Sequence, residues 1–393
     1  MTGTPLTDGL LPRSRERLVV LSLSLSAFAM ALNANGMAPL LPHLTQEFGL
    51  DDKARAGVLA GVPHLGNALG ALLIGPLVDR IGRRQPLLLS LCVFAGASAL
   101  HALVGSYEVF VAARLLTGIA VGIAFTCASA AVADLVPYTR LGRAMGVFNA
   151  GMFLAFAVGM PLASWLGSLG QWRLVFLVQA GLGALALLAA TSLPPGLGRS
   201  GRSVSPWLVL REPMVTPVLL AILVSVGPFF AIVQFSGRWL DETRLLPKDS
   251  QVFMFAILGL LAAAGSTLLG GVSDRIGKRN FVMITTALMA GAILYLPRIG
   301  SLQTLLLVGG PLAVIGASRT GASQALVSEL VEPRMRGTLM GVRSAAVTAG
   351  MGLAVWGGGW IYAHRGFTDF TRFAGGLMVL GYLLLRLFVR RSL

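Results

Sequence analysis

The chain is dominated by long apolar runs separated by short polar breaks. Of its 393 residues, 55% are hydrophobic and 12% are charged, about half the charged fraction of a soluble domain. A helix that crosses a bilayer core needs roughly 20 apolar residues. The runs reach about that length at twelve places: 18–41, 54–76, 86–105, 108–134, 144–166, 172–193, 214–236, 252–271, 280–297, 302–328, 338–362 and 370–389. A backbone in lipid must satisfy its own hydrogen bonds, and no alternating barrel pattern is present. The runs therefore predict an all-α integral membrane protein.

The distribution of basic residues predicts the orientation of these helices. With the N-terminus in the cytoplasm, 18 Lys and Arg fall in cytoplasmic segments and 9 on the other side. This bias favours a multi-pass protein of the cytoplasmic (inner) membrane with both termini in the cytoplasm. The first apolar run is too long for a signal-peptide core and no cleavage site follows it, so we expect it to be retained as a helix.

An internal repeat divides the chain into two halves. The charged turn 75-GPLVDRIGRRQ-85 returns 195 residues later as 270-GGVSDRIGKRN-280, and the pair 146-GV-147 returns at 341-GV-342 with the same offset. We therefore predict a six-helix bundle over 1–193, a cytoplasmic linker rich in Pro, Gly, Ser and Arg over 194–213, and a second six-helix bundle over 214–393. Parallel repeats of this kind are typical of secondary transporters.

The duplicated Asp-Arg-x-Gly-Arg/Lys-Arg turn in a twelve-helix chain resembles the major facilitator superfamily, and its pattern is similar to that of the drug/proton antiporter-like branch. The resemblance covers essentially the whole chain. It implies two pseudo-symmetric six-helix bundles that rock about a central site near the bilayer midplane and expose that site to each side in turn.

The resemblance assigns the repeated turns to gating. Asp79 is expected to sit against the positive end of helix eleven and to latch the outward-facing state. The arginines of this turn can pair with acids such as Asp134 or with lipid phosphate; alternatively, they only satisfy the positive-inside rule. The predicted conformational residues are Gly75, Asp79, Arg80, Gly82, Arg83, Arg84, Asp134, Arg143, Gly159, Pro161, Asp274, Arg275 and Gly277.

Two further helices resemble motifs of the same family. In 112-AARLLTGIAVG-122, Arg114, Gly118 and Gly122 share a helix face. An arginine two turns inside a span normally faces a partner or a water-filled cavity, although it can also snorkel to the outer interface. The stretch 151-GMFLAFAVGMPL-162 resembles the antiporter motif only faintly, because Met160 separates Gly159 from Pro161; a packing kink is the alternative.

The charges inside the spans favour an anionic or zwitterionic solute. Every Asp and Glu lies at a helix end or in a loop, whereas Arg114, Arg319 and Arg343 lie within spans. Uncompensated buried cations seek anions, and a guanidinium suits carboxylate or phosphate. We expect Arg319, with Arg114, to face the solute; a structural pairing of Arg319 with Glu329 or a helix-end carbonyl is the alternative.

Other polar and aromatic residues on apolar helices complete the predicted solute site, although each can instead bridge helices. The predicted solute-binding residues are Asn33, Asn35, His64, Asn67, Arg114, Asn149, Gln179, Phe229, Phe230, Gln234, Arg319, Gln324, Trp356 and Trp360. The predicted proton-coupling residues are His64, Arg114, Asp241 and Glu242.

The sequence thus predicts a proton-coupled secondary transporter of a small organic solute, with efflux preferred. Uptake or exchange of an organic anion is the alternative within the class, and a membrane sensor without net transport is the alternative from another class. No nucleophile–base signature, metal-ligand spacing or phosphate-binding loop is present. We expect a monomer that is not an enzyme, with no cofactor and no nucleic-acid partner, that contacts the solute, H+ and membrane lipids.

Overall fold

The computed structural model describes most of the chain in six segments. They are residues 12–35, 37–49, 53–198, 205–246, 248–332 and 335–389. The side chains of three predicted site residues, Asn35, Asp79 and Asp241, lie outside the described part.

The described residues form helices connected by short turns, and no strand occurs among them. The first half comprises α1 (Arg13–Asn35), α2 (Met37–Glu47), α3 (Lys53–Ile81), α4 (Arg84–Leu103), α5 (Tyr107–Leu135), α6 (Tyr138–Ser168) and α7 (Trp172–Ala190). The short α8 (Pro206–Leu210) precedes the second half, which comprises α9 (Val215–Thr243), α10 (Lys248–Ile276), α11 (Lys278–Tyr295), the 3-10 helix η1 (Leu296–Arg298), α12 (Leu302–Ser328) and α13 (Arg336–Phe388).

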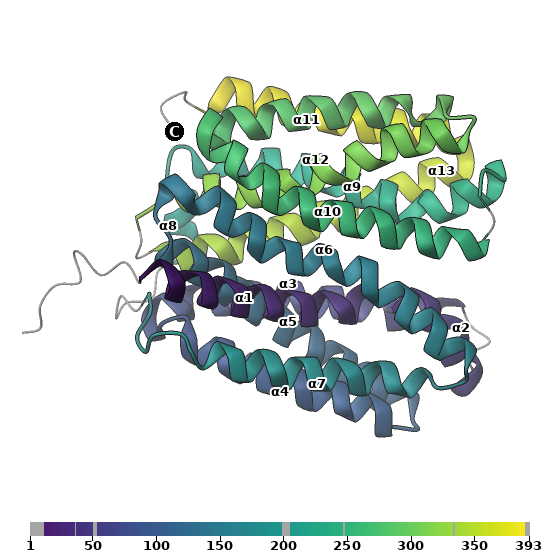
Figure 1. Cartoon of the computed structure of the whole chain (residues 1–393), viewed down its shortest axis with the longest axis horizontal. Coiled ribbons are helices and arrows are strands. Elements are labelled where there is room, and N and C mark those ends of the chain that lie inside the picture. The colour runs from purple at the N-terminus through teal and green to yellow at the C-terminus, as the bar shows by residue number, and fades with distance from the viewer. Residues whose placement is uncertain are drawn as a thin grey trace, which may run out of the picture.

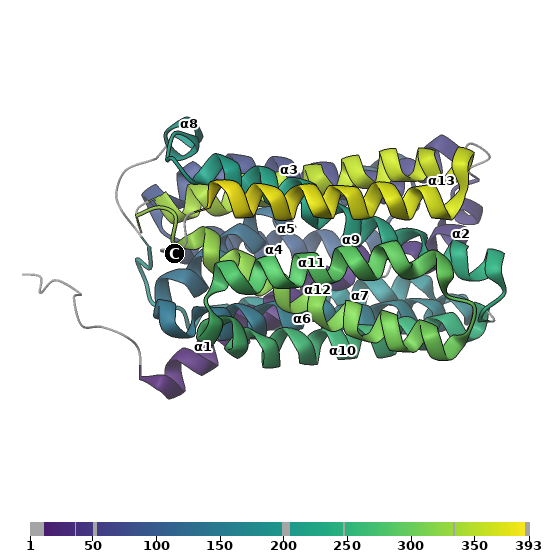
Figure 2. The same ribbon diagram turned by 90° about the horizontal axis from the view of Figure 1, so that it is seen from above.

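Ten helices in the described segments are long and apolar enough to cross a membrane. One of them, α13, is two helices joined at Gly366, whose φ of 83° breaks the helical path in a conformation that favours glycine. Figure 2 shows its two arms side by side. Counting α13 as two helices and adding the 29-residue α3 gives twelve long helices in the described segments. The predicted all-α fold is therefore confirmed.

The helices lie in two groups that meet along α6 and α10. Figure 1 shows α1–α7 on one side and α9–α13 on the other, with α6 and α10 adjacent between them. The start of α1, the short α8 and the C-terminal end of the described chain lie at the same end of the molecule.

Within the first half, α3 and α5 approach so closely that their contact positions hold glycine. A methyl group on Gly118 would lie 2.3 Å from the backbone oxygen of Pro63, and one on Gly122 would lie 2.1 Å from that of Asn67. Helices in lipid gain little from the hydrophobic effect between them, so close backbone packing of this kind is what holds them together. It also confirms that Arg114, Gly118 and Gly122 share a helix face, since Arg114 reaches the carbonyl of Leu59 one turn further along.

We expect Gly118→Ala to destabilise the protein by about 1–3 kcal/mol, because the added carbon must push two backbones apart. The apparent melting temperature of the purified protein would fall. Gly96→Ala is the control: this glycine lies inside α4 with no atom within 4 Å of an added carbon, so its melting temperature should be unchanged or higher. Equal melting temperatures for the two variants would contradict the close packing.

Candidate functional site

The two repeated turns close one end of the molecule by equivalent contacts between the halves. An added carbon on Gly75 of α3 would lie 3.3 Å from Cα of Thr338 in α13, and one on Gly270 of α10 would lie 3.0 Å from Cα of Arg143 in α6. Gly270 lies 195 positions after Gly75, and Thr338 lies 195 positions after Arg143. The two contacts are therefore related by the offset of the repeat. A second equivalent pair, Gly341 against Ala71 and Gly146 against Ser266, lies one turn away. We call the end of the bundle at these turns the charged end.

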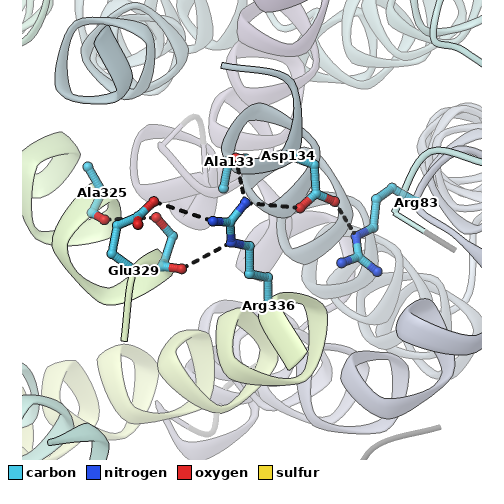
Figure 3. A network of polar contacts seen from close by, with 7 residues as sticks. Arg83, Ala133, Asp134, Ala325, Glu329 and Arg336 are labelled. Carbon is cyan, nitrogen blue, oxygen red and sulfur yellow. Dashed lines mark hydrogen bonds and ion pairs between the residues drawn. The ribbon is translucent and has the colours of Figure 1, made fainter. Parts of the chain in front are cut away.

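A chain of ion pairs links the halves at the charged end (Figure 3). Asp134, at the end of α5, accepts a hydrogen bond from Nε of Arg83 at 3.1 Å. Its other oxygen lies 3.6 Å from Nη1 of Arg336, which belongs to α13. Nη2 of Arg336 in turn donates to Glu329 at 3.4 Å. The pairing of this turn with Asp134 is present as the sequence indicated, and Arg336 extends it into the other half.

The second repeated turn binds the opposite half through backbone groups. The two carboxylate oxygens of Asp274 accept hydrogen bonds from the amides of Gly142 and Arg143, at 2.9 and 3.0 Å, near the start of α6. A carboxylate at this end of a helix is favoured by the helix dipole. Lys278 lies 2.9 Å from Asp274 and donates to the carbonyl of Tyr138 at 2.8 Å. The contact of Arg143 is therefore made by its backbone, while its side chain is exposed.

The remaining turn residues have smaller roles in the geometry. Gly82 and Gly277 have φ of 93° and 87°, the left-handed region that favours glycine in a tight turn. Arg84 donates to the carbonyl of Thr191. Arg80 and Arg275 are exposed. The latch role of Asp79 stays a prediction, because its side chain lies outside the described residues.

A buried polar network crosses the first half away from the charged end. Arg114 of α5 donates from Nη1 to Oδ1 of Asn33 in α1 at 2.9 Å, and Nδ2 of Asn33 donates to Oε1 of Gln179 in α7 at 2.8 Å. All three side chains are buried. The structure thus brings together three predicted site residues from three helices.

Two arginines are buried in the second half. Arg319 of α12 donates from Nε to the hydroxyl of Thr286 in α11 at 2.9 Å, and from Nη2 to the hydroxyl of Ser225 in α9. Arg343 of α13 donates to the hydroxyl of Ser323 in α12 at 3.2 Å. Thr286 and Ser225 also donate to carbonyls of their own helices, so each hydroxyl satisfies its helix and still accepts from the guanidinium.

Midway between the halves, two buried amides form a direct contact. Nδ2 of Asn149 in α6 donates to Oε1 of Gln324 in α12, and both side chains are fully buried. Oδ1 of Asn149 and Nε2 of Gln324 have no hydrogen-bond partner. This contact links α6 of the first half directly to α12 of the second.

An apolar cavity of about 120 Å³ lies between α6 and the second half. Phe229 and Phe230, which the sequence predicts to contact the solute, are in its wall. Most of the wall is apolar, and the aromatic residues in it are Phe153, Phe156, Phe229, Phe230, Trp239, Phe255 and Phe367. Phe153 and Phe156 come from α6, so both halves contribute to the wall.

His64 lies on the α3 face that meets α13 near the charged end. It precedes Ala71, which contacts Gly341, by seven residues, or about two helical turns. The side chain of His64 is nevertheless exposed. His64 is therefore exposed about two turns before the Ala71–Gly341 contact, on the side away from the charged end.

The other predicted residues are dispersed. Oδ1 of Asn67 is buried without a partner, Gln234 is exposed, and Trp360 stacks on His364. Glu242 accepts a hydrogen bond from Tyr362 at 2.6 Å. Three others are placed as follows: Trp356 is exposed, Gly159 is buried, and Pro161 lies inside α6. The predicted residues thus form several clusters and not one continuous site.

Sequence reasoning did not single out Arg336, Ser225 or Thr286. The position equivalent to Arg336 in the first half is Leu141, so the repeat gave no signal for it. Hydroxyl residues are common in membrane helices, where they bond to their own backbone, and nothing in the sequence distinguishes the two that also accept from Arg319.

Comparisons with known proteins agree with this geometry. The sequence model of the Major Facilitator Superfamily matches residues 23–247 and 246–392. An inner membrane transport protein of Escherichia coli K12, YdhP, is 28% identical over 65% of this chain and 66% of its own length. A probable sugar efflux transporter of Helicobacter pylori P12 is 25% identical over 91% of this chain and 92% of its own. The chain belongs to the major facilitator superfamily of membrane transporters.

Solved structures of other members share the fold. The crystal structure of the human organic anion transporter MFSD10 superposes with a TM-score of 0.80 at 21% identity, over 95% of this chain and all of the other. The proton:xylose symporter XylE superposes with a TM-score of 0.77 at 17% identity, over 96% of each chain. The fold and family predicted from the sequence are confirmed.

We expect Asp274→Asn to loosen the contact between α6 and α10, because the amide carries no charge and offers only one acceptor oxygen. The measurement is maleimide labelling of a cysteine at Ser266, which is fully buried and bonds to Gly146, with Cys92 and Cys127 replaced by serine. Loss of a hydrogen bond to a charged group costs about 1.5–3 kcal/mol, so labelling should accelerate at least about tenfold.

The control for this experiment is Asp369→Asn. Asp369 also pairs with an arginine, Arg372, at 2.9 Å, but both side chains are exposed and lie away from the α6–α10 contact. Its labelling rate should equal that of the parent. Labelling of the Asp274 variant at the parent rate would contradict a closing role for this carboxylate.

Proposed function

We propose that the protein moves a small organic anion or zwitterion across the cytoplasmic membrane by alternating access, coupled to protons, with efflux preferred. The observation that carries the anionic assignment is the state of Arg114, Arg319 and Arg343. All three are buried, and none forms an ion pair with an acid in the described segments. Buried cations without a carboxylate partner are costly, and an anionic solute would offset that cost.

Alternating access is supported by the contacts at the charged end. The turns after α3 and α10 hold the halves together there, while His64, two turns before the Ala71–Gly341 contact on the same α3 face, is exposed. We propose that the charged end is cytoplasmic, as the basic residues favour, and that the structure is closed on that side. Opening would break the Asp134–Arg336 and Asp274–α6 contacts.

The apolar cavity supports a solute with an aromatic or otherwise apolar body. Its wall comes from both halves, as a site between two rocking bundles requires, and it contains seven aromatic side chains. MFSD10, which shares the fold, is described as an organic anion transporter, and a relative is named a probable sugar efflux transporter. The cavity favours an organic anion over a sugar, whose hydroxyls need polar partners.

We propose that accessible titratable side chains carry the coupling proton. His64 lies in α3 and is exposed, and Glu242 is exposed with a hydrogen bond from Tyr362; these two side chains remain the leading proton carriers of the proposal. Arg114 and Asp241 remain the other predicted participants. Exchange or uptake of the anion without protons is the alternative, and a pH jump across proteoliposomes separates the two: only the coupled carrier accumulates solute against its gradient.

We expect Arg319→Gln and Arg319→Ala to abolish transport of an aromatic carboxylate in proteoliposomes while expression and melting temperature stay close to the parent. The reason is that the guanidinium is the solute's counter-charge, whereas its hydroxyl partners already bond to their own helices. Arg173→Gln, at an exposed pair with Glu47, should transport normally. Unchanged transport by the Arg319 variants would rule out the anionic assignment at this residue.

A further inference from the structure

Arg319 and Arg343, two of the buried arginines that form no ion pair in the described segments, are neighbours. Arg319 precedes Ser323 by one turn of α12, and Arg343 donates to Ser323 from α13. Arg319 and Ser323, four residues apart, lie on one face of α12, and Arg343 reaches that face from α13. Arg319 lies nine residues before the end of α12 and Arg343 seven residues after the start of α13, so both lie roughly 10–13 Å from the charged end. Two like charges therefore share one buried region.

The hydrogen bonding of this pair is incomplete. Together the two guanidinium groups have ten N–H donors, and their partners in the structure are three hydroxyls. Nε of Arg343 is buried without a partner. In the described segments, Nη1 of each arginine also lacks a hydrogen-bond partner. Both Nη1 atoms retain some contact with solvent. The side chains are 3% and 4% exposed, so the little surface that remains includes these free donors.

No group in the described segments neutralises the pair. Glu329, the acid nearest along α12, bonds to Arg336 at the charged end. Two adjacent buried cations repel each other and lack their hydration, and hydroxyl dipoles offset only part of that cost. A single negative charge would neutralise one arginine and leave the other uncompensated. A group with two negative charges and several acceptor oxygens would satisfy both.

We propose that Arg319 and Arg343 together bind a doubly charged anionic group, either one phosphoryl or phosphonyl group or two adjacent carboxylates. This inference rests on the proposed function, because it specifies the charge of the transported solute. The free Nη1 donors of the two arginines contact the anion, and Ser323 between them holds the second guanidinium in place.

The apolar cavity lies next to this pair and defines the other part of the ligand. Phe229 of the cavity wall follows Ser225, the partner of Arg319, by one turn of α9. The same ring would lie 2.8 Å from a carbon added to Gly316, one turn before Arg319 in α12. A ligand with its charged group at the arginines therefore directs its body towards the aromatic wall. The ligand class is an aromatic or acyl dianion.

The experiment compares thermal stabilisation of the purified protein by phthalate, which has two carboxylates on an aromatic ring, and benzoate, which has one, at equal ionic strength. A bound ligand raises the melting temperature by mass action. We expect phthalate to bind at least about tenfold more tightly than benzoate, the effect of one additional charge-assisted contact. Inorganic phosphate, tested alone, should stabilise the protein more than chloride does.

Arg343→Gln should reduce the apparent affinity for phthalate to that for benzoate, and should leave benzoate binding nearly unchanged. Arg343→Lys, which keeps the charge and is the variant to use if Arg343→Gln does not fold, should retain part of the preference. Arg279→Gln is the matched control: Arg279 is buried in the same half, but it bonds to the carbonyls of Val389 and Arg386, so its variant should keep the full preference.

The inference is overturned if phthalate and phosphate stabilise the parent no better than benzoate and chloride, or if Arg343→Gln keeps the preference for phthalate. Because binding is measured in detergent, these outcomes are independent of transport. If Arg319→Gln stops transport while the parent shows no preference for dianions, the proposed function stands and the pairing of the two arginines fails.

Discussion

The close approach of backbones between the halves at the charged end determines the rest of the arrangement. At Gly75, Gly270, Gly146 and Gly341 there is no side chain, so α3 meets α13 and α6 meets α10 nearly at backbone distance. In lipid this packing is the main attraction available to helices. The ion pairs of Asp134 and the amide contacts of Asp274 can form only because the helices are already this close.

The buried charges are distributed unevenly between the halves. In the first half, Arg114 donates to the amide of Asn33 and to the carbonyl of Leu59, and Asn33 in turn donates to Gln179. In the second half, Arg319 and Arg343 are held by hydroxyls, which are weaker acceptors than a carboxylate. The buried positive charges of the second half, which lie next to the aromatic cavity, are therefore less well compensated than the charge of Arg114. Under the proposed function, this asymmetry assigns the polar part of solute recognition to the second bundle, while the apolar wall is shared by both.

Much of the fold was accessible from the sequence, because the length of the apolar runs and the offset of 195 are strong signals. The structure adds that the contact at Gly75 has an equivalent at Gly270, related by the same offset. The two arms of α13 were predicted, with Gly366 between the predicted spans.

The candidate site was less predictable, because side chains that matter there are ordinary residues in unusual positions. Arg343 and Arg319 are visible as charges inside spans, but their proximity depends on how α12 and α13 pack. The aromatic wall draws on four different helices and has no local pattern beyond the Phe229–Phe230 pair. From the sequence, Arg336 is only one of the 18 basic residues that favour a cytoplasmic location for their segments. The repeat does not distinguish it, because the equivalent position holds Leu141.

The two junctions between the halves are built from different chemistry, and they therefore differ in how strongly a substitution disturbs them. At the junction of α6 and α10, Asp274 binds main-chain amides, which almost any residue at position 143 supplies. At the junction of α3 and α13, one arginine serves two acids, Asp134 and Glu329, so its loss leaves both without that counter-charge. A substitution at position 143 therefore leaves the first junction intact, whereas a substitution of Arg336 removes a counter-charge from two acids at the second.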